Sequence, residues 1–371
     1  MFRIFYAEKD ATLYESLPNY NTGLDEVIEI GKRLDTAGGT KLSRGVVQFD
    51  MTEVSQSLAT YGKTVNDCNF ILRLYTTHAK NLASQYSIYA KLVGESWTNG
   101  TGFQNVLTTD GVSWTGSNSG SSWISSSQNV QIGTSTLYVS GSGEGGSWMY
   151  QTSISGSTSG LISSESFTTR TTDINMDVTD AIKLWLSGSA GASIPNYGFL
   201  LKYADADESG SIVTGYVRFF SRDTHTIYVP QLLMYWDNST FTTGSLSQVN
   251  TESFVIYNDV KPQYKDTEIV KIRVYARDKY PKKSPTNLFP YETIKYLPST
   301  TCYAVYDAET DEAIIPYNDI YNKVSCDATS NFIYLDMNGF MPERYYRLEF
   351  KLKDGFMEQY IDDKIYFKVV R

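Results

Sequence analysis

The stretch that decides the fold lies near the start of the chain and reads Arg44-Gly-Val-Val-Gln-Phe-Asp50. Successive side chains of a β-strand point to opposite faces, so a strand here places Val47, Phe49 and Met51 on one face. The other face, with Val46, Gln48 and Asp50, is more polar. The pattern therefore predicts a half-buried strand of a β-sandwich.

Two later segments add a short helix and further strands. Residues 177–186 read Asp-Val-Thr-Asp-Ala-Ile-Lys-Leu-Trp-Leu, in which Asp177 or Thr179 can cap a helix. Apolar residues recur in this segment at helical spacing, which predicts a helix that closes one end of the sandwich: Val178, Ile182, Trp185 and Leu186. Strand patterns bounded by turn residues follow at 199–203, 217–221 and 230–236.

The order and spacing of the segments at 44–50, 177–185 and 196–202 resemble the DNRLRE-type β-sandwich. This family occurs in bacterial surface and polysaccharide-associated proteins and in structural proteins of tailed bacteriophages. The resemblance implies attachment or assembly rather than chemistry. Residues 340–352 and 360–370 also resemble closing segments of tailed-phage virion proteins.

The composition is typical of an all-β protein, because 14% of the residues are aromatic and helix-favouring stretches are scarce. We expect an all-β fold, with a jelly-roll-like β-sandwich followed by a smaller C-terminal immunoglobulin-like β-sandwich. The first domain is predicted at 1–237. Polar, turn-forming residues at 238–249 indicate a linker, and six or seven strand patterns place the second domain at 250–371.

An insertion rich in Gly, Ser and Trp is predicted at about 97–166. Residues 110–166 contain 29 Gly plus Ser in 57 positions, and there is no Lys or Arg between Lys91 and Arg170. Exposed indole faces stack on sugar rings, so a glycan platform is one interpretation of the tryptophans in this region. The alternative is that they pack over the sandwich end or contact a neighbouring subunit. The four residues are Trp97, Trp114, Trp123 and Trp148.

One segment resembles the start of a calcium loop, with oxygen-bearing side chains at Asp205, Asp207 and Ser209 and a glycine at the sharp turn. The twelfth position is Tyr216 instead of the glutamate that such a loop needs. A solvated acidic loop between two strands is therefore the alternative, and we expect no metal and no cofactor.

A basic, proline-punctuated loop in the second domain contains Lys279, Lys282 and Lys283. Such a loop could dock on an acidic neighbour. It is equally typical of a solvated surface.

Catalytic motifs are scarce in the sequence. His78 and His225 are the two histidines, and Cys68, Cys302 and Cys326 lack the spacing of a zinc site, so we expect three reduced thiols. No serine-hydrolase elbow, paired zinc-binding histidines or phosphate-binding glycine loop occurs. The sequence thus predicts a protein that is not an enzyme.

The charge and the N-terminal sequence bear on partners and location. A net charge of −9 argues against general nucleic-acid binding, and no apolar run approaches the roughly 18 residues that cross a bilayer. The N-terminus lacks the pattern of a signal peptide, so we expect synthesis in a host cytoplasm and location in the virion.

The resemblance then implies a non-enzymatic structural protein of a tailed bacteriophage, placed at the neck or tail or as a head accessory protein. Its partners would be other virion proteins and copies of itself. The alternative is a carbohydrate-binding module of a phage receptor-binding protein or of a bacterial surface protein.

Overall fold

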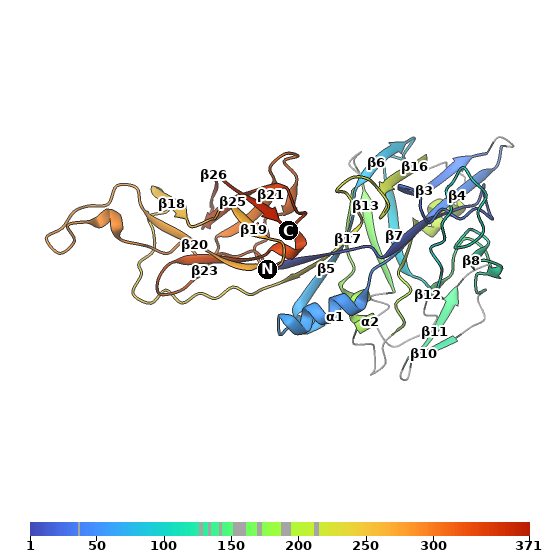
Figure 1. Cartoon of the computed structure of the whole chain (residues 1–371), viewed down its shortest axis with the longest axis horizontal. Coiled ribbons are helices and arrows are strands. Elements are labelled where there is room, and N and C mark those ends of the chain that lie inside the picture. Colours follow the sequence, from blue (N-terminus) through green and yellow to red (C-terminus); the bar gives the residue numbers. More distant parts are fainter. Residues whose placement is uncertain are drawn as a thin grey trace. The chain divides into compact units, whose positions relative to one another are not determined.

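The computed structural model describes residues 1–35, 38–125, 129–132, 135–140, 143–150, 161–168, 173–186, 194–210 and 215–371. The chain divides into two compact units, and Figure 1 labels many of their strands. The N-terminal unit is Phe5–Met234, and the C-terminal unit is Met1–Ile4 together with Tyr235–Arg371. Paired strands dominate both units, which confirms the predicted all-β sandwich class.

The larger sheet of the N-terminal unit has the strand order β13-β7-β15-β4-β3-β16-β6, with β2 also paired to β4. Its strands are β2 (Lys9–Tyr14), β3 (Val27–Leu34), β4 (Thr40–Gln48), β6 (Thr76–Lys80), β7 (Tyr86–Leu92), β13 (Ile162–Phe167), β15 (Phe199–Tyr203) and β16 (Gly215–Phe220).

The smaller sheet has the order β1-β17-β5-β14, formed by β1 (Phe2–Tyr6), β5 (Cys68–Leu74), β14 (Ile174–Asp177) and β17 (Gln231–Trp236). Short strands of the Trp-rich insertion form separate small sheets: β8 (Gly116–Asn118), β9 (Ser121–Ser122), β10 (Asn129–Ile132), β11 (Ser135–Ser140) and β12 (Trp148–Tyr150).

Helix α1 (Met51–Thr60) follows β4 directly. The Asp50 side chain accepts a hydrogen bond from Thr52 N at 2.7 Å and so caps the first turn of the helix. The prediction that Met51 belongs to the strand is therefore wrong. A 3-10 turn, η1 (Val65–Asp67), leads from α1 to β5.

Helix α2 (Thr179–Leu186) confirms the helix predicted for residues 177–186. Asp177 Oδ1 accepts from Thr179 N at 2.9 Å at its start. On its buried face Trp185 packs against Phe199 of β15, with ring centroids 4.8 Å apart. The helix thus covers part of the sandwich core.

The C-terminal unit contains two sheets, with the orders β18-β20-β24-β23 and β19-β26-β25-β21-β22. The hydroxyl group of Tyr303 in one sheet donates to Tyr334 O in the other at 3.4 Å, as expected where two sheets share a core. The strands are β18 (Phe254–Asn258), β19 (Gln263–Lys265), β20 (Ile269–Asp278), β21 (Cys302–Asp307), β22 (Ala313–Ile315), β23 (Ser325–Cys326), β24 (Asn331–Asp336), β25 (Tyr345–Asp354) and β26 (Met357–Val370), with 3-10 turns η2 (Pro290–Glu292) and η3 (Met337–Gly339).

Two segments join the C-terminal unit that the sequence does not assign to its sandwich. The first is 238–249, expected as a linker, where Thr242 N donates to Cys326 O at 2.9 Å and Val249 N donates to Tyr296 O at 3.0 Å. The second is the chain start, where the Met1 amino group donates to Tyr321 O at 2.6 Å and Phe2 packs on Phe340 at 5.4 Å between ring centroids. Both segments are therefore hydrogen bonded into this unit.

All three cysteines are buried, and burial raises the pKa of Cys68, Cys302 and Cys326 to about 11. A thiol with such a pKa is a poor nucleophile at neutral pH.

In the part of the chain that the structure describes, the helices lack the length and apolar character of a membrane span.

Candidate functional site

The Trp-rich insertion covers one face of the larger sheet. Val47 and Leu201 face the sandwich core, and the alternate residues Val46 and Leu200 join a second buried cluster on the opposite face. Both Val46 and Leu200 are fully buried, so the prediction that the strand at 44–50 is half-buried is wrong. The cluster consists of Ala11, Leu13, Val46, Val93, Trp97, Val112, Trp114, Trp123 and Leu200.

The Asn21 side chain fastens the insertion to the N-terminal segment of the chain. Its Nδ2 donates to Asn99 O at 2.7 Å and to Val112 O at 2.8 Å. Its Oδ1 accepts from Gly102 N at 2.7 Å and from Gly23 N at 3.2 Å. Asn21 is fully buried, so these four bonds are shielded from water.

A second fastening point is Glu95, whose carboxylate accepts from Ile124 N at 2.5 Å and from the hydroxyls of Ser147 and Ser117, each at 3.2 Å. These hydrogen bonds join three separate parts of the insertion. The described residues of this Ser- and Gly-rich insertion are therefore held in place by specific hydrogen bonds.

Three of the four candidate tryptophans are buried. Trp97, Trp114 and Trp123 are 3%, 6% and 2% exposed, and their indole faces lie within the cluster. The indole nitrogens of Trp97 and Trp123 donate to backbone oxygens, at 2.8 Å to Tyr197 O and at 2.9 Å to Ser113 O. The arrangement of these three favours the packing interpretation over a sugar platform.

Trp148 is half-buried and lies at the centre of a group of cationic side chains. The Arg44 guanidinium, Lys91 Nζ and Lys202 Nζ lie 5.6, 4.7 and 5.3 Å from the centroid of its ring. Lys91 and Lys202 are 3% and 2% exposed, so both charges have been removed from bulk water. We call Arg44, Lys91, Lys202 and Trp148 the cation cluster.

Two carboxylates offset part of this charge. Glu208 accepts from Arg44 at 2.7 Å and pairs with Lys202 at 2.6 Å, and Asp205 pairs with Lys91 at 2.9 Å and with Lys202 at 2.5 Å. Arg44 also donates to Gly145 O at 2.6 Å, which ties the insertion to the cluster. Asp205 is exposed, whereas Glu208 and its partners Arg44 and Lys202 are largely buried, and removing one partner of a buried pair is costly.

The calcium-loop candidates lie on a short helix, α3 (Asp205–Ser209), instead of an open loop. The Asp205 carboxylate already pairs with two lysines, and the Asp207 carbonyl accepts from Lys32 at 3.0 Å. The Ser209 hydroxyl donates to Asp205 O at 2.8 Å. Among the described residues, no three His, Cys, Asp or Glu side chains are grouped to hold a metal ion.

Burial and charge oppose each other in this cluster. Burial, together with the charge of Lys202, lowers the pKa of Lys91 despite the hydrogen bond and charge of Asp205. At Asp205 burial raises the pKa, but the hydrogen bonds and charges of Lys202 and Lys91 outweigh it, and the net pKa is lowered. Asp205 thus stays ionised at neutral pH and serves as a counter-ion.

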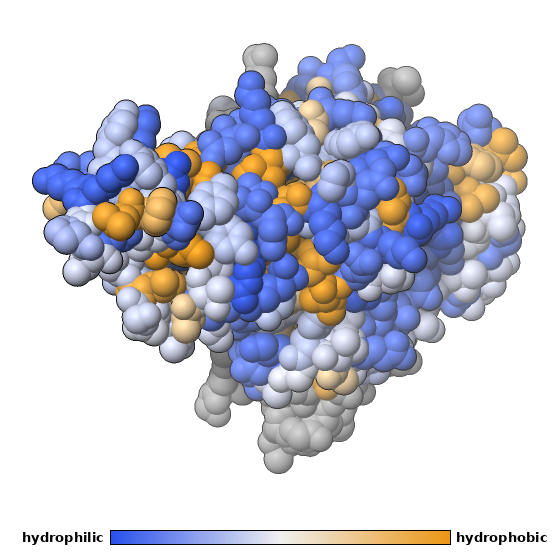
Figure 2. All heavy atoms as spheres, turned by 60° about the vertical axis from the view of Figure 1, so that its left-hand side comes forward, coloured by the Kyte–Doolittle hydropathy of each residue, from blue (hydrophilic) through white to orange (hydrophobic). Residues whose placement is uncertain are grey.

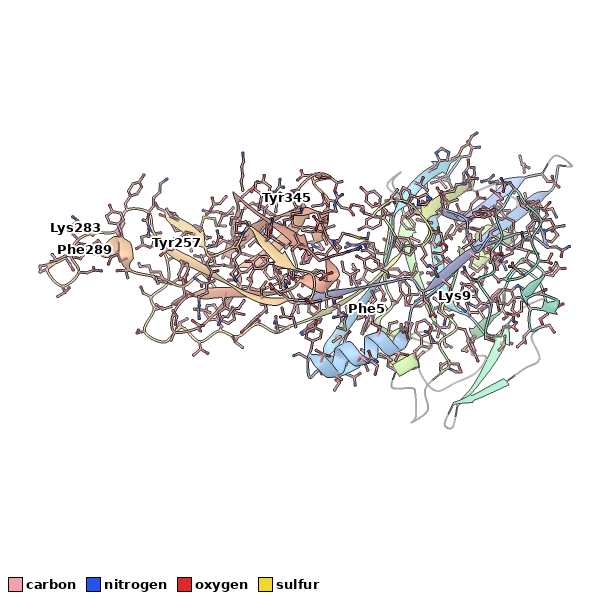
Figure 3. All side chains as sticks on the ribbon, viewed as in Figure 1. Phe5, Lys9, Tyr257, Lys283, Phe289 and Tyr345 are labelled. Carbon is pink, nitrogen blue, oxygen red and sulfur yellow. The ribbon has the colours of Figure 1, made fainter. Side chains whose placement is uncertain are left out.

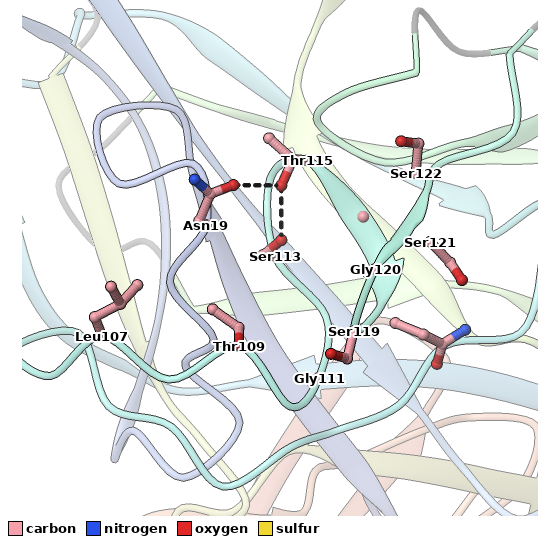
Figure 4. A pocket seen from close by; sticks show the side chains of 12 residues that line it. Asn19, Leu107, Thr109, Gly111, Ser113, Thr115, Ser119, Gly120, Ser121 and Ser122 are labelled. Atoms are coloured by element: carbon pink, nitrogen blue, oxygen red, sulfur yellow. Dashed lines mark hydrogen bonds between the residues drawn. The ribbon is translucent and has the colours of Figure 1, made fainter.

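A polar pocket of about 400 Å³ opens on the surface of the insertion (Figure 4). Thr115 Oγ1 in its wall donates to Asn19 Oδ1 at 2.9 Å and lies 3.2 Å from Ser113 Oγ. None of the described residues that line it is charged. They are Asn19, Leu107, Thr109, Gly111, Ser113, Thr115, Gly116, Asn118, Ser119, Gly120, Ser121 and Ser122.

Beside this pocket lies an exposed apolar patch. Phe103, Val106 and Leu107 are 44%, 55% and 59% exposed. The exposed Asp110 accepts from Thr101 Oγ1 at 2.6 Å, and the hydrogen bonds from Thr101 hold its pKa below the usual range. We call residues 101–122 the insertion face.

The candidate lysines Lys279, Lys282 and Lys283 are exposed in the loop 279–294, which extends beyond the ends of β18 and β20 (Figure 1). An ion pair between Lys295 and Asp278 at 2.5 Å closes its base. Near its tip, Ser284 and Asn287 exchange two backbone hydrogen bonds of 3.1 Å. Residues 279–294, the lysine loop, thus have a defined conformation.

The lysine loop also carries apolar side chains that point to solvent. Figure 3 labels Lys283 and Phe289 on it. The exposed fractions are large: Tyr280 75%, Leu288 63%, Phe289 69% and Tyr291 52%.

Exposed apolar side chains concentrate on the C-terminal unit. Figure 2 shows hydrophobic patches that interrupt the hydrophilic surface of the molecule. Of the 17 large hydrophobic side chains that are exposed in the described residues, 12 belong to this unit. They are Phe241, Tyr257, Ile269, Tyr280, Leu288, Phe289, Tyr291, Ile320, Tyr345, Phe356, Tyr360 and Tyr366.

No protein-family model matches the chain, and no curated protein is significantly similar to it in sequence. Among solved structures, the chain is similar to the crystal structure of the adhesin domain of Epf from Streptococcus pyogenes. That match covers 97% of this chain and 91% of the other, with 7% identity and a TM-score of 0.17. A TM-score this low does not assign a fold or a function to this chain. Membership of the DNRLRE-type family stays a prediction.

The structure brings together candidates that the sequence treats separately. Trp148 from the insertion and Asp205 from the calcium-loop candidate meet in the cation cluster. Lys91 is not among the candidates predicted from the sequence. Its position in the sequence could have pointed to it. Lys91 is the last basic residue before the segment without Lys or Arg, close to where the insertion begins.

Proposed function

We propose that the chain is a non-enzymatic structural protein of a tailed bacteriophage particle, which assembles through protein–protein contacts at the neck or tail or as a head accessory protein. The observation that carries the assembly role is the set of 12 exposed apolar side chains on the C-terminal unit. Exposed apolar patches rimmed by polar residues mark protein interaction sites. The phage context comes from the sequence resemblances at 44–50, 177–202 and 340–370.

The state of the candidate residues supports a structural role. Three tryptophans and the cation cluster contribute to internal packing and ion pairs. Charged side chains that hold one another in this way stabilise a rigid body. The exposed apolar side chains of the C-terminal unit would then supply contacts for repeated assembly, in which many modest contacts add up.

The direct test is quantitative mass spectrometry of purified particles from a phage that encodes this chain, together with deletion of its gene. We expect a fixed number of copies per particle and defective particles from the deletion. Normal particles that lack the protein would contradict the proposal.

The polar pocket favours a second candidate function, binding of a carbohydrate. Its hydroxyl and amide groups offer hydrogen bonds to sugar hydroxyls. A glycan array with the intact chain and with Asn118→Ala tests it. Retention on a defined glycan that Asn118→Ala abolishes would favour this candidate, and absence of any retention would exclude it.

A further inference from the structure

We propose that the lysine loop of one copy of this chain binds the insertion face of a second copy, so that the protein associates head to tail. The inference rests on the proposed function, because an assembling protein needs two surfaces that complement each other. It adds the identity of the partner and the two surfaces that meet.

The first argument is the apolar character of both surfaces. Tyr280, Leu288 and Phe289 on the lysine loop are each more than 60% exposed. On the insertion face Val106 and Leu107 are 55% and 59% exposed. Aromatic side chains that enter a pocket dominate the energy of protein interfaces.

The second argument is shape. The lysine loop projects from its unit and is ordered by its own hydrogen bonds, so it needs little further ordering on binding. The insertion face is hollowed by a pocket of about 400 Å³, and Leu107 lines that pocket. A projecting aromatic tip and an open pocket beside an apolar patch have complementary forms.

The third argument is charge. The lysine loop carries three lysines and one glutamate, in a chain whose net charge is −9. The insertion face belongs to the segment without Lys or Arg, and it exposes the ionised Asp110. Opposite charges around an apolar centre steer association and fix its orientation.

Two different surfaces meet in such a contact, so the interface is heterologous. Heterologous contacts close into rings or grow into filaments, depending on the rotation between copies. An acidic partner of another sequence and an anionic lipid surface are the competing occupants of the lysine loop.

The test uses sedimentation velocity of the full chain at low salt and increasing concentration. We expect concentration-dependent association that Phe289→Asp on the loop or Leu107→Lys on the face weakens by about tenfold or more. Leu34→Asp is the matched control, because Leu34 is 66% exposed at the end of β3 and lies outside both surfaces. That variant should associate like the unmodified chain.

Mixing the variants identifies the interface as heterologous. Phe289→Asp retains an intact face and Leu107→Lys retains an intact loop, so an equal mixture should form dimers and nothing larger. A chain that stays monomeric, or that associates as well with Phe289→Asp, overturns the inference. Flotation of the chain with anionic vesicles that Phe289→Asp abolishes, without self-association, also overturns it and assigns the loop to a lipid surface.

Failure here is distinguishable from failure of the proposed function. A monomeric chain that is nevertheless a fixed component of phage particles would leave the proposed function intact and remove the head-to-tail contact.

Discussion

Replacing Asn21 with alanine should release the insertion from the sheet that it covers. The substitution removes four buried hydrogen bonds, to Asn99 O, Val112 O, Gly102 N and Gly23 N. Each is worth about 1 kcal/mol net, and the backbone groups left behind are buried, so we expect a loss of about 3 kcal/mol after partial rescue by water. In a unit of this size that corresponds to a fall in Tm of roughly 6–12 °C.

The assay is urea and thermal unfolding followed by tryptophan fluorescence. Four of the six tryptophans lie in the insertion, so its release is visible whether it opens by itself or with the whole unit. Asn19→Ala is the matched control, because Asn19 is exposed and its side chain accepts one hydrogen bond, from Thr115 at 2.9 Å. Equal stability of the two variants would refute the fastening role of Asn21.

Two further predictions concern buried charges. Arg44→Met should lower the free energy of unfolding by about 2–3 kcal/mol, a loss that is limited because Glu208 still pairs with Lys202. A double-mutant cycle with Glu208→Gln should show coupling between the two residues. Additive effects of the two substitutions would contradict the ion pair. Burial raises the pKa of Asp10 to about 7, and the hydrogen bond from Arg222 N only partly offsets it. Between about pH 4 and 7 the folded state then holds a proton that the unfolded state has lost, so the free energy of unfolding falls as the pH rises, by up to about 4 kcal/mol. Asp10→Asn should remove this part of the pH dependence. If the variant and the unmodified chain show the same dependence of the unfolding midpoint on pH, Asp10 is ionised in the folded state and the prediction is wrong.

Local patterns were sufficient to predict many of the strands. The patterns at 199–203, 217–221 and 230–236 correspond to β15, β16 and β17, because apolar and β-branched residues between turns carry their own signal. Strand β13 lacks that signal, since its sequence Ile-Ser-Ser-Glu-Ser-Phe is mostly polar. It forms by pairing with β7 along six residues.

The burial of β4 on both faces could not be read from the sequence. Val46 is covered by tryptophans that lie about fifty to eighty positions later, and nothing local to 44–50 indicates this. The same limit applies to the cation cluster, where Arg44, Lys91 and Lys202 come from three strands. The alternation continues from Phe49 to Met51 and so predicts that Met51 belongs to the strand, but Asp50 caps helix α1 and the strand ends before it.

Composition alone predicts the role of a segment less well. A Ser- and Gly-rich segment with tryptophans fits an exposed binding loop and a packed cover equally, because both need turns and bulky side chains. Only the contacts of Trp97, Trp114 and Trp123 separate the two.

Cryo-electron microscopy of purified particles from a phage that encodes this chain tests the central claim most directly. The account predicts density for both units in symmetric copies, with the exposed apolar side chains of the C-terminal unit covered by neighbouring virion proteins. Particles of full occupancy without such density, or with those side chains left facing solvent, would contradict it.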